Sequence, residues 1–258
     1  MKRQFDPALP ELMDRLQPVT RELERDLANL RSFNRWFGSH RLIRHFLRLW
    51  LRPNGKARVL DIATGSGDIP RLIVDHARRQ NVLVQIDAID QQESTIEIAR
   101  ELSTDYPEID FSCANLFDWS PSPSLKLDWL NQSSLSEPYD IVLCSLALHH
   151  FTNDDALRVL QKLRELSRGA VLVADLRRAR WLSVAVFLAT AMFYREPMTK
   201  SDARVSAARA FSFVEMRELA KRGSWKNFRH RKFAVGRQAI WIDPSGTGGF
   251  PRDGEFSE

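Results

Sequence analysis

The sequence predicts an α/β fold in which a mostly parallel sheet is covered by helices on both faces and preceded by a helical N-terminal cap. Three observations predict it. Apolar residues recur at helical spacing through the first fifty positions, and short apolar runs then alternate with amphipathic segments. A glycine-rich turn joins the first of these runs to the segment after it. Together they indicate a Rossmann-like architecture.

The cap is predicted over residues 1–54. Apolar residues recur every three or four positions from Leu12 to Phe33, which places them on one helical face. Pro18 is expected to break or kink this helix, because proline lacks the amide hydrogen that a helix interior uses. A second amphipathic helix is predicted from Leu42 to Trp50.

Residues 55–243 are predicted to form one large domain of alternating strands and helices. The predicted strands lie at 58–63, 82–89, 109–114, 139–145 and 169–174. The predicted helices lie at 69–79, 94–102, 153–167 and 213–221. Two closing strands, expected as an antiparallel pair, lie at 227–235 and 237–242. Strands that alternate with helices favour parallel pairing through crossover connections.

Three segments depart from this alternation. Residues 119–138 are rich in Ser and Pro and predict a surface loop. Residues 177–213 predict a helical insertion after the fifth strand. Residues 244–258 combine Pro, Gly and charge with few apolar side chains, which predicts a disordered tail.

Composition narrows the class of protein. The chain of 258 residues carries 38 basic and 33 acidic side chains, a formal charge of +5. The excess is spread out, so solvated helix faces are favoured over a nucleic-acid surface. The longest apolar run, Trp181 to Tyr194, is shorter than the roughly 20 residues of a membrane span. Cys113 and Cys144 lack metal-ligand spacing and are expected as reduced thiols in the core, which favours a cytoplasmic location.

The glycine-rich turn lies in the run Val-Leu-Asp-Ile-Ala-Thr-Gly-Ser-Gly-Asp, from Val59 to Asp68. Gly65 and Gly67 permit a sharp turn and a close approach of a ligand to the backbone. The fingerprint of dinucleotide-binding folds has a third glycine where this chain has Pro70. Asp68 at the helix entry would repel phosphate and suits a cationic ligand, so a nicotinamide or flavin dinucleotide is disfavoured.

Asp90 ends the second predicted strand, about 23 residues after Gly67. A carboxylate there can accept hydrogen bonds from both hydroxyls of a ribose. Asp87 belongs to the same strand but lies an odd number of residues away, so its side chain is expected on the other face. Asp90 is therefore the predicted ribose ligand; the alternative is that it caps the helix that begins near Ser94.

These features resemble the class I S-adenosylmethionine-dependent methyltransferases. The resemblance rests on the run from Val59 to Asp68, on Asp90, and on Tyr-Asp-Ile-Val-Leu-Cys-Ser at 139–145, and it covers roughly residues 55–175. It implies a Rossmann-like fold and S-adenosylmethionine as the cofactor.

Two subgroups share further segments with the chain. Ala-Thr-Gly-Ser-Gly-Asp at 63–68 and Leu-His-His-Phe at 148–151 resemble the ubiquinone/menaquinone methyltransferase-like group. That group also has an alanine at the position of Ala63, where most of the superfamily has glycine. The segments that resemble methyltransferases associated with type III polyketide synthases are 34–38, 175–178 and 206–211.

The resemblance implies a cofactor site around the glycine-rich turn and the ends of the neighbouring strands. Its implied residues are Asp61, Ala63, Thr64, Gly65, Ser66, Gly67, Asp90, Gln91, Asn115, Leu116 and Ser145. Asn115 stands where many members have Asp. An amide and a carboxylate can both accept a hydrogen bond from the exocyclic amine of adenine, so this departure is mild.

His149 and His150 follow the fourth predicted strand, at the sheet edge where open α/β folds bind ligands. The methyl group on a sulfonium is already activated, so the protein has to align the acceptor and exclude water. A base assists when the acceptor is a phenol or an acidic carbon, and His149 or His150 is the candidate. The alternative is that both histidines only shape the pocket.

The acceptor pocket is expected beneath the cap and the 177–213 insertion. Its candidate apolar walls are Trp36, Phe37, Trp181, Phe187, Met192, Phe193 and Tyr194. We expect methyl transfer to oxygen or carbon of a small, partly hydrophobic acceptor. An RNA methyltransferase is an alternative if basic residues converge on the pocket mouth. A non-catalytic cofactor-binding partner protein is another, if the acceptor pocket is blocked. The oligomeric state is not predicted.

Overall fold

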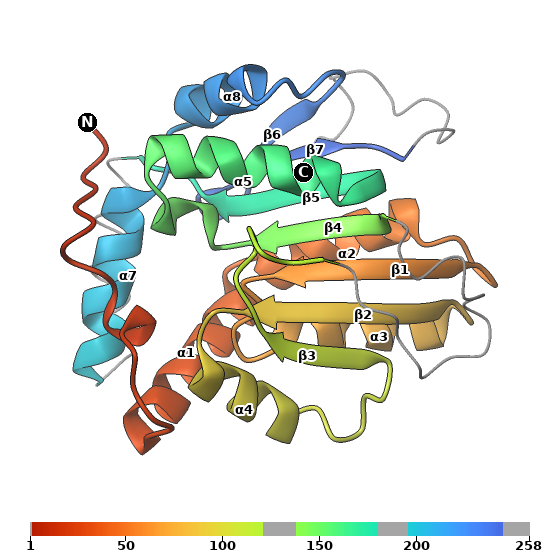
Figure 1. Ribbon diagram of the computed structural model, residues 1–258, viewed down its shortest axis with the longest axis horizontal. Coiled ribbons are helices and arrows are strands. Elements are labelled where there is room, and N and C mark those ends of the chain that lie inside the picture. The colour runs from red at the N-terminus through yellow and green to blue at the C-terminus, as the bar shows by residue number, and fades with distance from the viewer. Residues whose placement is uncertain (1, 121–137, 180–195, 245–258) are drawn as a thin grey trace.

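A mixed sheet forms the centre of the computed structural model, which describes residues 2–120, 138–179 and 196–244 (Figure 1). In the described residues it has seven strands in the order β3-β2-β1-β4-β5-β7-β6. The strands are β1 Lys56–Ile62, β2 Leu83–Asp90, β3 Ile109–Cys113, β4 Tyr139–Ser145, β5 Ser167–Leu176, β6 Arg229–Phe233 and β7 Arg237–Ile242. The first five pair in parallel, and β7 runs antiparallel to both β5 and β6. The predicted mostly parallel sheet and its antiparallel closing pair are confirmed.

Helices cover both faces of the sheet, as predicted. Helices α2 (Ser39–Trp50) and α3 (Asp68–Arg79) bury their apolar faces in one core, and α5 (Asn153–Glu165) and α8 (Phe213–Arg222) bury theirs in the other. Helix α4 (Glu93–Glu101) packs beside β2 and β3. These helices match their predicted ranges closely, because each presents an apolar stripe to a sheet that is hydrophobic on both sides.

The start of the chain differs from the prediction. Helix α1 spans Arg21–Trp36, and residues 2–20, here called the N-terminal segment, contain only a short 3-10 turn, η1, at Leu12–Asp14. The expected helix before Pro18 is therefore wrong. The side chain of Thr20 accepts a hydrogen bond from the Leu23 amide at 3.2 Å and caps α1, so the helix begins after the proline.

The N-terminal segment lies beside helix α7 (Pro197–Arg209), at the edge of the sheet to which the parallel strands point (Figure 1). The amides of Leu12 and Met13 donate to the Asp202 carboxylate of α7 at 2.9 and 3.0 Å. The Arg3 guanidinium donates to the carbonyl of His149 at 3.0 Å. The N-terminal segment and α7 therefore cover the carboxyl-terminal ends of the parallel strands.

Several predicted features fall outside the described residues. They are most of the 119–138 loop, the apolar run from Trp181 to Tyr194, and the tail from residue 245 onward. Helix α7 accounts for the described end of the 177–213 insertion. In the described ranges, no helix has the length and apolar content that crossing a membrane requires.

Candidate functional site

The turn after β1 reverses the chain by using left-handed backbone conformations. Ala63, Gly65 and Gly67 have φ values of +54°, +55° and +75°. A Cβ on Gly67 would lie 2.8 Å from the Phe111 ring, so this position requires glycine, whereas nothing lies within 4 Å of a Cβ on Gly65. The left-handed conformation of Ala63 costs roughly 1–2 kcal/mol more than it would cost for glycine. The strained turn lines two adjoining cavities.

The first cavity, here called the Asp90 cavity, has a volume of about 280 Å³. Asp90 lies at the end of β2, and its Oδ2 accepts a hydrogen bond from the Gly65 amide at 2.9 Å. Its Oδ1 accepts from the Gln92 amide at 3.1 Å. Burial raises the pKa of Asp90 above its ordinary value. Asp87 instead contacts Arg58 and Tyr139, away from this cavity.

The second cavity, here called the Asp61 cavity, has a volume of about 220 Å³. Its apolar walls include Leu27, Leu30, Phe33, Phe37, Leu176 and Val235. Asp61 is buried, with 2% of its surface exposed, and burial raises the pKa of its carboxyl to about 8. Among the described residues, Asp61 Oδ2 and Thr64 Oγ1 have no hydrogen-bond partner. Two buried polar atoms therefore face this region unsatisfied, which is costly unless a ligand satisfies them.

The two cavities adjoin at the glycine-rich turn and the end of β4. The residues that line both are Met13, Ala63, Gly65, Leu146 and His150. Leu146 has a φ of +58°, so a second left-handed residue without glycine's freedom lies at this junction. An elongated ligand can therefore occupy both spaces at once.

His149 lies in a 3-10 turn, η3 (Leu148–His150), after β4 and is held by Asp175 near the end of β5. Its Nδ1 lies 2.7 Å from Asp175 Oδ1, and its backbone amide donates to Asp175 Oδ2 at 2.9 Å. Burial would raise the pKa of Asp175, but the charge and hydrogen bond of His149 hold it below its ordinary value. An ionised Asp175 accepts a hydrogen bond from His149 Nδ1–H, which leaves Nε2 as the reactive nitrogen.

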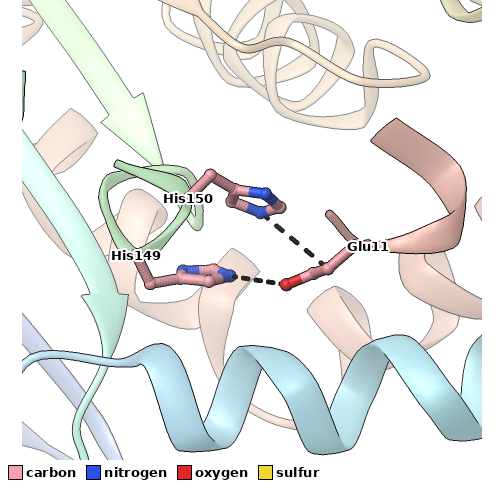
Figure 2. Close-up of side chains that lie close together, drawn as sticks. All are labelled: Glu11, His149 and His150. Carbon is pink, nitrogen blue, oxygen red and sulfur yellow. Dashed lines mark ion pairs between the residues drawn. The ribbon is translucent and has the colours of Figure 1, made fainter. Parts of the chain in front are cut away.

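His150 is surrounded by carboxylates. Its Nδ1 lies 2.6 Å from Asp14 Oδ2. Burial alone would lower its pKa, but the carboxylates of Glu11, Asp14 and Asp175 raise it to about 9. Figure 2 shows Glu11 pointing from the N-terminal segment between the two imidazoles, 3.8 Å from His149 Nε2 and 3.9 Å from His150 Nε2.

Most of the predicted cofactor and catalytic residues come together here. Asp61, Ala63, Thr64, Gly65, Ser66, Ser145, His149 and His150 line the Asp61 cavity, and Asp90, Gln91 and Leu116 line the Asp90 cavity. Two predicted residues line neither cavity. Gly67 is the N-cap of α3, and the exposed Asn115 turns its Oδ1 toward the Phe117 amide, from which it accepts at 2.9 Å.

Some features differ from the prediction or were missed. Trp36 is 77% exposed and is not a pocket wall, whereas Phe37 is one. Cys113 is exposed, while Cys144 is buried. The missed residues, Glu11 and Phe33, come from the N-terminal segment and α1. The helical spacing of Leu27, Leu30 and Phe33 carried a usable signal, because these residues share one face with Phe37.

The sheet order, the glycine-rich turn and a polar site at the carboxyl ends of the strands together define the class I methyltransferase fold. Residues 60–170 match the family described as a methyltransferase domain. This segment is thus similar to that family, and the resemblance of the chain to the class I S-adenosylmethionine-dependent methyltransferases is confirmed at the level of fold. None of the curated proteins that were compared matches the chain.

Solved structures share the fold at low sequence identity. The plantazolicin methyltransferase BpumL, in complex with SAH, superposes with a TM-score of 0.60 at 12% identity, over 87% of this chain and 91% of its own. Human N-acetylserotonin methyltransferase in complex with SAM has a TM-score of 0.58 at 14% identity, over 86% of this chain and 56% of its own. A putative O-methyltransferase from Nostoc punctiforme has a TM-score of 0.55 at 16% identity, over 79% of this chain and 55% of its own.

Proposed function

We propose that this protein binds S-adenosylmethionine and transfers its methyl group to an oxygen or acidic carbon of a small, partly hydrophobic acceptor. The observation that carries the proposal is the junction of two cavities at Ala63, Gly65 and Leu146. Asp90 lies on one side of this junction, and the paired His149 and Asp175 lie on the other. In this proposal, the space for the nucleoside adjoins the space in which His149 acts as the general base.

The residues present fit the cofactor. Asp90 is placed to accept hydrogen bonds from the ribose hydroxyls, with Gln91 and Leu116 beside the base. The unsatisfied Asp61 Oδ2 and Thr64 Oγ1 suit the ammonium group of the methionine part. The solved methyltransferases BpumL and human N-acetylserotonin methyltransferase, which hold SAH and SAM, support the same assignment.

S-adenosylmethionine, when bound, supplies a methyl group activated by its sulfonium charge. The apolar walls of the Asp61 cavity hold the acceptor and exclude water, which aligns the reacting atoms. His149 Nε2 accepts the proton of the acceptor's hydroxyl or acidic carbon. That atom would receive the methyl group that the bound cofactor supplies. Asp175 stabilises the imidazolium that forms.

The alternatives find less support. The RNA methyltransferase hypothesis expects basic residues around the pocket, but besides the histidines Arg31 and Arg237 are the basic side chains among the described lining residues. The non-catalytic hypothesis expects a blocked acceptor space, but the described residues leave an Asp61 cavity of about 220 Å³. We include a cytoplasmic location in the proposal, and the free thiols of Cys113 and Cys144 support it.

A panel of phenols, enols and carboxylic acids, assayed with radiolabelled S-adenosylmethionine, tests the proposal. We expect label transfer to at least one acceptor class and its loss in His149→Gln, with affinity for S-adenosylhomocysteine retained. Tight binding of the nucleoside with no transfer to any small acceptor, but with transfer to RNA, would replace the small-molecule acceptor by the RNA alternative.

A further inference from the structure

Three side chains converge on one point at the wall of the Asp61 cavity. The donor atoms of Glu11, His149 and His150 all lie within 4.8 Å of one another (Figure 2). Glu11 is 3% exposed and His149 is 2% exposed, so these two side chains are screened from bulk water, whereas the side chain of His150 is 23% exposed. All three residues line the cavity, which gives a small ion a route of entry.

Each of these side chains is oriented by another polar group. His149 Nδ1 is held by Asp175 at 2.7 Å, and His150 Nδ1 by Asp14 at 2.6 Å. The Ser206 hydroxyl donates to Glu11 Oε1 at 2.7 Å. A histidine that ligates a metal almost always donates its other ring N–H to a carboxylate or carbonyl. Here both histidines make that contact, and both Nε2 atoms are left facing Glu11.

We propose that Glu11, His149 and His150 bind a divalent first-row transition-metal ion such as Zn²⁺. Two histidines and one carboxylate with open positions form a recurrent set for such ions. Bonds of about 2.0–2.2 Å separate neighbouring donors by roughly 2.8–3.1 Å at octahedral angles and by roughly 3.3–3.6 Å at tetrahedral angles. The Glu11 oxygens lie 3.8 and 3.9 Å from the two Nε2 atoms, and the three donors all lie within 4.8 Å of one another, so side-chain displacements of less than about 2 Å complete the site.

The open coordination positions face the acceptor space. An oxygen-bearing acceptor, such as a phenol, enol or hydroxy-carbonyl compound, would bind the ion and ionise more readily. This consequence rests on the proposed function, whereas ion binding does not. His149 Nε2 cannot both ligate the ion and accept a proton, so in the metal-bound protein the ion ionises the acceptor in place of His149 and the released proton passes to water.

Calorimetric titration of untagged, chelator-stripped protein with Zn²⁺, and visible absorption spectra with Co²⁺, test the site without an acceptor. We expect one ion per chain with micromolar or tighter affinity, and Co²⁺ bands typical of four- or five-coordination. Glu11→Gln and His150→Gln should each weaken Zn²⁺ binding at least about 100-fold, and Asp14→Asn by about 10–100-fold. His45→Gln, on α2 and outside the cavity lining, is the matched control and should change nothing.

Wild-type protein that binds neither ion stoichiometrically would overturn the proposal. So would Zn²⁺ affinity that persists in both Glu11→Gln and His150→Gln. Asp14→Asn alters only the orienting partner of an accessible histidine, so it remains informative if a ligand variant fails to fold. Titration of the same stripped samples with S-adenosylhomocysteine reports separately on the cofactor, so failure of the metal site leaves the proposed function testable.

Discussion

The Nδ1 atom of His149 and the Oδ1 atom of Asp175 lie 2.7 Å apart and join the ends of two neighbouring parallel strands. Asp175 also accepts a hydrogen bond from the backbone amide of His149 at 2.9 Å, so one carboxylate fixes both the imidazole ring and the backbone that carries it. Asp175 is 1% exposed and His149 is 2% exposed. A hydrogen bond between such buried groups defines which nitrogen of the imidazole can react.

Asp175→Asn tests this pairing in metal-free protein. We expect methyl transfer to fall about 10²–10⁴-fold, because the amide no longer orients and stabilises a charged imidazole. Affinity for S-adenosylhomocysteine should change little, since Asp175 lines neither cavity. The transfer rate as a function of pH, measured for both proteins, checks the effect. A fully active variant with an unchanged pH profile would remove His149 from the proposed chemistry.

The glycine-rich turn predicts unequal costs at its two glycines. Gly67→Ala should lower the free energy of unfolding by about 2–5 kcal/mol, because a Cβ in this left-handed conformation also overlaps the Phe111 ring. Gly65→Ala is the matched control and should cost only about 1–2 kcal/mol, since open space surrounds its Cβ. Urea denaturation measures both values. Equal losses would contradict the account of Gly67.

Asp61 predicts a pH-dependent stability of the unliganded protein. Burial raises the pKa of its carboxyl from 3.8 to about 8, so the folded state favours the protonated form. The stability from this group is complete below about pH 4 and is lost as the pH rises through about 8. The side chain that Asp61→Asn introduces cannot ionise, so the Tm of this variant should fall less than the wild-type Tm between pH 6 and pH 9. Each kcal/mol of stability that the variant retains corresponds to a difference of about 2–4 °C in Tm.

Thermal melts of wild type, Asp61→Asn and Asp118→Asn across this pH range make the comparison. Asp118 is exposed, so its variant should follow the wild-type curve. Curves of Tm against pH that run parallel for wild type and Asp61→Asn would show that Asp61 does not titrate there.

Asp202 holds the N-terminal segment over the site. Asp202→Ala should leave the amides of Leu12 and Met13 without their acceptor, at a cost of roughly 1–3 kcal/mol. Hydrogen exchange of these two amides should accelerate about 5–150-fold, the same free energy expressed as a rate ratio. Asp105→Ala, at an exposed position, is the control. Exchange that stays at the wild-type rate would mean that the segment is held by other contacts.

The sequence predicted the sheet well, because its strands and helices have contrasting hydrophobic periods. Tyr139–Ser145 and Arg237–Ile242 form strands over the same residues that the apolar pattern indicated. The position of Asp90 beside a cavity was also predictable, since a carboxylate that ends a parallel strand lies at the carboxyl end of the sheet, where open α/β folds bind ligands. The N-terminal segment was mispredicted because its apolar spacing continues through Pro18, where the helix cannot.

The contacts in the site between residues far apart in the sequence could not be predicted from the pattern of neighbouring residues. Glu11 lies 138 residues before His149 in the sequence, and nothing in its neighbouring residues marks it as part of a site. Asp175 could have been found, because it lies near the end of a parallel strand, as His149 follows another. Trp36 shows the reverse error, since an aromatic side chain at helical spacing was placed on the wrong side of its helix.

Calorimetric titration with S-adenosylhomocysteine, on wild type and Asp90→Ala, tests the central claim most directly. The account predicts micromolar binding by wild type. Asp90→Ala should bind about 100-fold or more weakly, because the ribose hydroxyls lose the carboxylate that accepts their hydrogen bonds. Asp118→Ala should bind as wild type does. Wild-type protein that does not bind S-adenosylhomocysteine, or Asp90→Ala protein that binds it as tightly as wild type, would contradict the proposed cofactor site.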